Sequence, residues 1–202
     1  YHTEKNIKFR SGKELEVRLH IIAVKDEQNR IINYIGILSD LTEHKLKERR
    51  LSYLENYDPL TDLPNRFYYN YQLHLYLISQ QDSLQQLAVI RLNIDRFRPL
   101  NEYLSNNGGD ELLRQVAQRL RITNAEALIV AHLNGDDFAI VYEISHIRPS
   151  IEEHCERITK AFNLPFNVQG QEHIITLSMG VSLYPEHGRQ LDYLNNCAEQ
   201  AL

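Results

Sequence analysis

The stretch from Leu128 to Tyr142, with the sequence LIVAHLNGDDFAIVY, decides the fold class. Its two apolar runs, Leu128–Leu133 and Phe138–Tyr142, are each long enough to form a strand. Asn134-Gly135 follows the first run, and this dipeptide is the strongest short signal for a two-residue β-hairpin. We therefore expect two antiparallel strands here, with the acidic pair Asp136-Asp137 where they meet.

Helices and strands alternate on both sides of this hairpin, which predicts an α+β domain over residues 57–202. Its expected core is one central mixed, largely antiparallel sheet flanked by helices. The other expected elements are a helix from about Phe67, a strand over Leu87–Asp95, a helix opened by Asp110, a helix over Ile151–Phe162, a strand from Ile175 to Leu183 and a final helix from about Gln190.

Residues 1–42 have the pattern of β-structure. Apolar and polar residues alternate over Leu15–Ala23, which predicts a strand with one buried face. The mostly apolar run Ile31–Leu38 predicts a second strand, buried on both faces. At most three strands fit into this segment, too few to close a core, so we expect it to be the edge of a longer domain.

A charged helix is expected over residues 43–56. Asp40 is a suitable N-cap, and Glu43 follows three residues later as in a capping box. The apolar residues of this helix form only a short stripe. It is therefore either a solvated connector or a helix that carries a signal by pairing with its copy in a dimer.

The composition excludes several classes of protein. With 43% hydrophobic and 24% charged residues the chain is expected to be globular, and its net charge of −5 argues against a nucleic-acid partner. Cys155 and Cys197 lack the spacing of a metal site, and no apolar run approaches the length of a membrane span. We expect a cytoplasmic location, possible membrane attachment lying upstream in a longer parent protein.

Four motifs then point to one family. Asp58–Arg66, Leu92–Arg98, Asn101–Leu113 and Ser178–Val181 occur in the order found in GGDEF domains, the nucleotide cyclase-like modules of cyclic-di-GMP signalling. The resemblance covers nearly all of residues 57–202. It places the family signature in the hairpin as the degenerate sequence Asn134–Phe138.

Two other stretches bear on this assignment. The letters Gly-Gly-Asp-Glu also occur at Gly108–Glu111, but leucine follows them inside a predicted helix, so they are not the signature. Residues 1–42 resemble the closing strands of a PAS sensor domain, on Phe9–Lys13, Tyr34–Gly36 and Asp40–Glu43.

The resemblance implies a site. Active family members join two GTP molecules, one from each subunit, and they use Mg²⁺ to offset the phosphate charge. By the same resemblance, Asn101 and Asp110 contact the guanine edge. The implied site residues are Asn101, Asp110, Phe97, Arg98 and Gly135 for the nucleotide, Asp136, Asn93 and Ile94 for the metal, and Asp137 for catalysis.

Several of these positions depart from the family pattern. Asn93 stands where a metal-binding carboxylate is expected, and an uncharged amide is a poorer Mg²⁺ ligand. Asp95, two residues later, is a conceivable partial substitute. Asp137 is one methylene shorter than the family's glutamate. The arginine and aspartate of the product-inhibition site are replaced by Ile129 and His132.

Three functions remain open at this point. The first is a degenerate GGDEF domain that binds GTP, with Mg²⁺ at a weakened site, and regulates an attached output domain. The second is an active diguanylate cyclase. The third is a scaffold that binds no nucleotide and only dimerises or transmits a signal. Expected partners are GTP, a second copy of the chain and an EAL-type phosphodiesterase domain downstream in the parent protein.

Overall fold

The computed structural model describes residues 2–8, 12, 14–79, 86–144 and 150–202. The chain divides into two compact units, Tyr1–Leu54 and Glu55–Leu202, which are described separately. Among the described residues, no helix is both long enough and apolar enough to cross a membrane.

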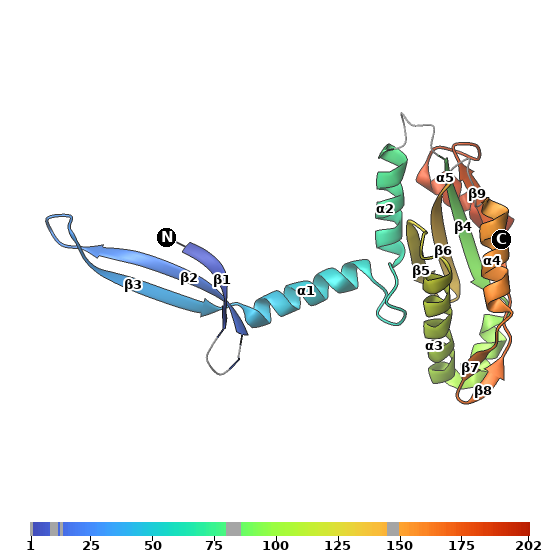
Figure 1. Ribbon diagram of the computed structural model, residues 1–202, viewed down its shortest axis with the longest axis horizontal. Helices are drawn as coiled ribbons and strands as arrows, with labels where there is room; N and C mark the ends of the chain where they lie inside the picture. Colours follow the sequence, from blue (N-terminus) through green and yellow to red (C-terminus); the bar gives the residue numbers. More distant parts are fainter. Residues whose placement is uncertain (1, 9–11, 13, 80–85, 145–149) are drawn as a thin grey trace. The chain divides into compact units, whose positions relative to one another are not determined.

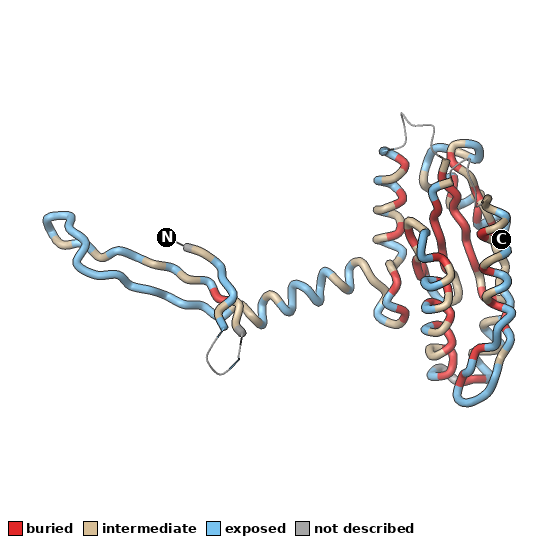
Figure 2. Tube along the Cα trace, viewed as in Figure 1, coloured by how far each residue is buried: buried red, intermediate tan, exposed pale blue. Residues whose placement is uncertain are grey.

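The first unit contains a three-stranded antiparallel sheet in the order β1-β2-β3, formed by His2–Lys8, Glu14–Lys25 and Ile31–Asp40. The expected alternation is present over part of β2, where Val17 is buried while Arg18 and His20 are exposed, but Ala23, expected on the buried face, is exposed. The expected burial of Ile31–Leu38 was wrong, because β3 is exposed along its whole length. Only β2 flanks this strand, and no described element covers either of its faces (Figure 2).

Helix α1, Thr42–Asn56, is attached to this sheet at its first turns. The N-cap position is Leu41, one residue later than expected, since its carbonyl oxygen accepts from the N–H of Lys45. The Asp40 carboxylate still accepts a hydrogen bond of 2.8 Å from the backbone N–H of Thr42 and so satisfies one of the first N–H groups of the helix. The Lys45 ammonium group then lies 2.9 Å from Glu4 on β1. No residue of α1 is buried, so the helix is held by polar contacts and not by a packed apolar face.

The second unit has the predicted α+β architecture. Its four-stranded sheet has the order β5-β6-β4-β9, and all three strand pairings are antiparallel (Figure 1). Strands β7 and β8 form a separate hairpin. The elements are α2 (Arg66–Ser79), β4 (Gln86–Ile94), α3 (Phe97–Thr123), β5 (Ile129–Asn134), β6 (Asp137–Ile144), α4 (Ile151–Phe162), β7 (Phe166–Val168), β8 (Gln171–His173), β9 (Leu177–Tyr184) and α5 (Leu191–Ala201).

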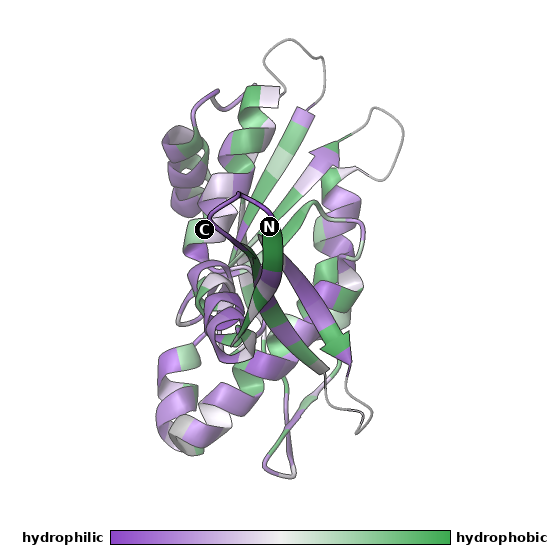
Figure 3. Ribbon diagram, turned by 90° about the vertical axis from the view of Figure 1, so that its left-hand side faces the viewer, coloured by the Kyte–Doolittle hydropathy of each residue, from purple (hydrophilic) through white to green (hydrophobic). Residues whose placement is uncertain are grey.

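Helices cover both faces of this sheet. Along β4, Leu87 and Val89 pack with α2 and α5, whereas Ile90 and Leu92 pack with α3 and α4. This alternation follows from the two-residue period of a strand, and it makes β4 almost continuously buried (Figure 2). The helices carry both hydrophobic and hydrophilic residues along their length (Figure 3).

Two expected details were wrong. Helix α3 begins at Phe97, so Asp110 lies in the interior of the helix and does not cap it. The two residues of the β5–β6 turn are Gly135 and Asp136, one position later than expected. Asn134 instead pairs with Asp137 in the ladder, and only Gly135 has a positive φ, of 50°. A turn of this kind needs glycine at its first central position, which Gly135 supplies.

Candidate nucleotide site

A bend in α3 brings Asn101 against Gly109. A Cβ atom added to Gly109 would lie 1.7 Å from Oδ1 of Asn101. In a straight helix the rise over eight residues is about 12 Å, so the backbone must bend between these two positions. Gly109 permits the contact because it has no side chain, and the amide of Asn101 therefore lies beside the residue that precedes Asp110.

Asn101 and Asp110 are both half-buried, and neither side chain has a hydrogen-bond partner among the described residues. An amide offers both a donor and an acceptor, whereas an ionised carboxylate only accepts. Guanine presents N–H donors together with acceptor atoms on its edges. The pair is therefore chemically suited to a guanine base.

The first turn of α3 holds Phe97 and Arg98. The preceding residue, Arg96, has the left-handed conformation with φ of 56°, and its side chain makes no capping hydrogen bond. The first backbone N–H groups of a helix have no partner within it, so this end favours an anion. Phe97 packs partly against the core, while Arg98 is exposed and pairs with Glu102 at 3.4 Å.

The signature hairpin is attached to the loop before α2 by a buried histidine. His132 Nε2 lies 2.8 Å from the carbonyl oxygen of Gly135, and its ring stacks on Phe138 with centroids 4.7 Å apart. Its Nδ1 lies 3.0 Å from Oδ1 of Asp58. Sequence analysis noted His132 only as a change in the product-inhibition site and missed this link.

Asp58 is the other end of that link. Burial raises the pKa of its carboxyl, but contacts with His132 and with the hydroxyl and N–H of Thr61 outweigh this effect, so the pKa is lowered overall. Thr61 donates through its N–H at 2.8 Å and through its hydroxyl at 2.7 Å. The Asp58 carboxylate therefore fixes the approach of the loop to the hairpin.

The expected metal positions meet at the ends of β4 and β6. Asn93 lies directly opposite Asp137 on β6 and opposite Ser178 on β9. The backbone N–H of Ile94 donates to the carbonyl oxygen of Asp136 at 3.3 Å. The described residues contain no group of three or more His, Cys, Asp or Glu side chains that could hold a metal ion.

Asp137 is paired with an arginine that sequence analysis did not single out. Arg91 Nε donates to Asp137 Oδ1 at 3.2 Å, and Arg91 Nη2 donates to Oδ2. The Arg91 side chain is only 5% exposed and that of Asp137 15%. Arg66 Nη2 lies 3.6 Å from the same Oδ2. The candidate catalytic carboxylate is thus held in a mostly buried ion pair.

Asp95 is also engaged. Ser178 donates its hydroxyl to Asp95 Oδ1 at 2.6 Å, and Thr176 donates its hydroxyl to Oδ2. These two hydrogen bonds, that of Ser178 first, lower the pKa of the Asp95 carboxyl. Asp95, which could partly replace the carboxylate missing at Asn93, is therefore hydrogen-bonded to Ser178 on β9 and to Thr176 just before it.

Comparison with known proteins decides the family. The family model described as "Diguanylate cyclase, GGDEF domain" matches residues 55–202. The chain belongs to the GGDEF family.

Relatives of this GGDEF protein carry different names. It is 30% identical to an uncharacterized signaling protein of Caulobacter vibrioides over 95% of this chain and 24% of that protein. It is 32% identical to the cyclic di-GMP phosphodiesterase NbdA of Pseudomonas aeruginosa over 75% of this chain and 19% of that protein. The chain thus spans about a quarter or less of the length of these two relatives.

A solved structure gives the same fold. A sensory box/GGDEF family protein from Caulobacter crescentus matches with a TM-score of 0.67 and 33% identity, over 73% of this chain and 95% of that one. The GGDEF domain of TpbB from Pseudomonas aeruginosa matches with a TM-score of 0.65 and 30% identity, over 72% and 85%.

The residues at the hairpin of this GGDEF domain do not fit a magnesium site. Mg²⁺ needs charged oxygen ligands in near-octahedral geometry. Asn93 contributes no charge, the oxygens of Asp137 accept from Arg91, and those of Asp95 accept from two hydroxyls. Among the three metal positions that the family resemblance implies, this leaves Asp136 as the one carboxylate.

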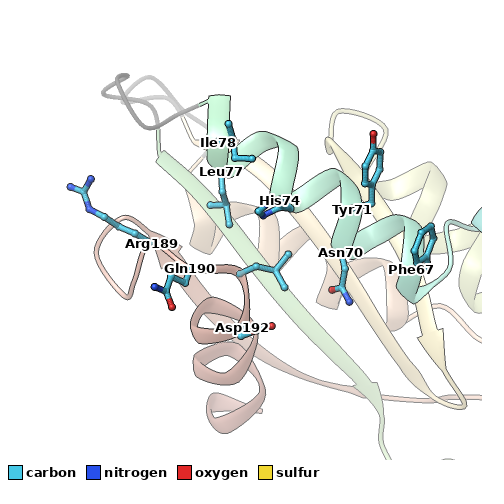
Figure 4. Close-up of a pocket in the computed structure, with 10 residues that line it drawn as sticks. Phe67, Asn70, Tyr71, His74, Leu77, Ile78, Arg189, Gln190 and Asp192 are labelled. Atoms are coloured by element: carbon cyan, nitrogen blue, oxygen red, sulfur yellow. The ribbon is translucent and has the colours of Figure 1, made fainter.

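A cavity of about 640 Å³ lies elsewhere, between α2 and α5 (Figure 4). Its lining includes Phe67, Tyr71, His74 and Ile78 from α2, and Gln190 at the start of α5. It contains none of the residues implied for the nucleotide, the metal ion or catalysis, so we place the candidate site at the α3 bend and the hairpin.

Proposed function

We propose that residues 57–202 form a degenerate GGDEF domain that binds GTP and regulates an attached output domain without making cyclic di-GMP. The observation that supports this most strongly is the contact between Asn101 and Gly109, next to Asp110. It places the half-buried amide of Asn101 beside the residue that precedes the half-buried Asp110, and neither side chain has a partner among the described residues. Such groups gain most from a ligand that pairs with them.

The proposed lack of turnover rests on the hairpin. A catalytic carboxylate must be free to meet the reacting atoms with the correct geometry. Asp137 is shorter than the family's glutamate, and its oxygens accept from Arg91. Asn93 adds no charge beside it. The binding half of the site is therefore retained in this proposal, and the half that performs the reaction is lost.

The proposed regulatory role extends to the first unit. Residues 1–42 act as the edge of a PAS-type sensor. Ion pairs such as Lys45–Glu4 attach α1 to the sheet of this unit. Helix α1 transmits the state of the sensor and supports a homodimer. One relative, the cyclic di-GMP phosphodiesterase PdeR of Escherichia coli, matches 96% of this chain, which covers 31% of that protein. An EAL-type phosphodiesterase is accordingly the output domain that we propose.

Two measurements on the full-length protein test this function. Calorimetric titration with GTP should show saturable binding, and chromatography after incubation with GTP and Mg²⁺ should show no cyclic di-GMP. Robust production of cyclic di-GMP would establish an active cyclase instead. Absence of GTP binding by a folded protein would leave the scaffold function.

A further inference from the structure

We propose that Arg91 is a fixed cation of the signature hairpin: it neutralises Asp137 next to the implied metal positions and so replaces a divalent metal ion there. The part of this inference that concerns the ligand rests on the proposed function: the domain binds GTP without requiring a divalent ion. The part that concerns the metal is independent of any nucleotide.

The sheet register explains why these two residues meet. Arg91 lies opposite Ala139, and Asp137 is the diagonal neighbour two residues away on β6. Diagonal neighbours in an antiparallel pair are within reach of a long side chain. On the other side of Arg91, β9 places Gly180 opposite it. Because Gly180 has no side chain, the backbone of α5 comes very close: a Cβ atom added to Gly180 would lie 2.0 Å from the carbonyl oxygen of Ala198. Arg91 is therefore covered by α5.

The geometry of the pair is that of a fork. Arg91 donates through Nε and Nη2 to the two different oxygens of Asp137. Bidentate arginine–carboxylate pairs are among the strongest hydrogen-bonded ion pairs, and this one is largely removed from water. A metal ion that took Asp137 as a ligand would leave the Arg91 guanidinium buried, with Glu199, at 3.7 Å, as its remaining acidic partner among the described residues. Buried charges that lose their partner are strongly disfavoured.

The charges at the hairpin lead to the same conclusion. Asp136 and Asp137 are the two negative groups at its turn, and Arg91 and Arg66 lie at or near Asp137 with two positive charges. Asn93, opposite Asp137, is neutral. The charge of Asp137 is therefore already matched by Arg91, and the half-exposed Arg66 guanidinium remains accessible to the phosphates of a nucleotide.

The part of the proposal that concerns the metal ion is tested with Mn²⁺ alone, because this ion broadens the NMR signals of nearby amides. In the unmodified protein, the amides of Asn93, Asp136 and Asp137 should broaden no more than the amide of the exposed Glu186 at the same Mn²⁺ concentration. Saturable broadening centred on the hairpin at submillimolar Mn²⁺ would overturn the proposal.

A gain of metal binding tests the role of Arg91 directly. Arg91→Met keeps a long, unbranched side chain but removes its charge, so selective Mn²⁺ broadening should appear at Asp136 and Asp137. The matched control Arg91→Met/Asp137→Asn should lose that broadening again. Well-dispersed amide spectra establish that the variants are folded. If Arg91→Met is unfolded, the titration of the unmodified protein decides the question by itself.

The part of the proposal that concerns the nucleotide is tested by measuring the affinity for GTP in the presence of Mg²⁺ and in excess EDTA. The two dissociation constants should agree within about two-fold, and a tenfold or greater weakening in EDTA would contradict metal-independent binding. Failure to bind GTP in both buffers would refute the proposed function and the part of the proposal that concerns the nucleotide, while the Mn²⁺ titration would still decide whether Arg91 replaces a metal.

Discussion

Replacing Gly109 with alanine separates the guanine contacts from the stability of the helix that carries them. Gly109 has no positive φ, so alanine is compatible with its backbone, and alanine in a helix interior is favoured over glycine by up to about 1 kcal/mol. The new Cβ would, however, occupy the position of the Asn101 amide, 1.7 Å from its Oδ1. Because this atom is the end of a side chain, Asn101 can rotate away without unfolding the domain.

The expected result is a loss of GTP affinity in a protein of nearly unchanged stability. Removing the paired amide costs about 1–3 kcal/mol of binding free energy, which corresponds to a weakening of about 5-fold to 150-fold. Calorimetry measures the affinity, and urea unfolding measures the stability, which should change by less than about 1 kcal/mol.

The double variant provides the control. In an Asn101→Ala background, Gly109→Ala should weaken GTP binding no further, since the side chain that it displaces is already absent. The reasoning would be refuted if Gly109→Ala left GTP affinity unchanged while Asn101→Ala lowered it, because the contact at the α3 bend would then have no part in recognition.

Four further results are expected. Asn93→Asp with Asp137→Glu should raise cyclic di-GMP production above that of the parent protein, by chromatography, and unchanged production would mean that these carboxylates are not what limits turnover. Calorimetry should show no submicromolar binding of cyclic di-GMP, because Ile129 and His132 replace the charged pair of the product site. Light scattering should show less dimer after removal of residues 1–56, and an unchanged monomer in both forms would make α1 a plain connector. Burial and a neighbouring arginine lower the pKa of His154 below 6.5, so this histidine contributes stability above pH 6.5 that is lost as the pH falls below that value; urea unfolding should show this loss, and His154→Gln should reduce it.

Local patterns were sufficient for much of the fold. The bounds of α4 agree with the prediction, because Ser150 caps this helix and Glu153 completes the capping box. The hairpin was found from its apolar runs and its glycine. The start of α3 was predicted wrongly, because Asp110 has the features of a helix cap. The helix has in fact already begun at Phe97, and it bends before Gly109. The pair Gly108-Gly109 marks this place in the sequence, but local propensity does not distinguish a bend inside one helix from the start of another.

The candidate site was only partly accessible from the sequence for a similar reason. Asn101 and Asp110 were indicated by their place in a motif, and the structure adds the contact with Gly109. The ion pair of Arg91 and Asp137 joins residues 46 positions apart and depends on the register of β4 with β6. Register is set by the packing of the whole sheet, so no inspection of either segment alone could reveal the pair.

One measurement tests the central claim most directly. The full-length protein is incubated with GTP and Mg²⁺ and separated from free nucleotide, and both the retained fraction and the reaction mixture are analysed by chromatography. The account predicts retained GTP, lost in a folded Asp110→Ala variant, and no cyclic di-GMP in the mixture. Accumulation of cyclic di-GMP, or a folded protein that retains no GTP, would contradict it.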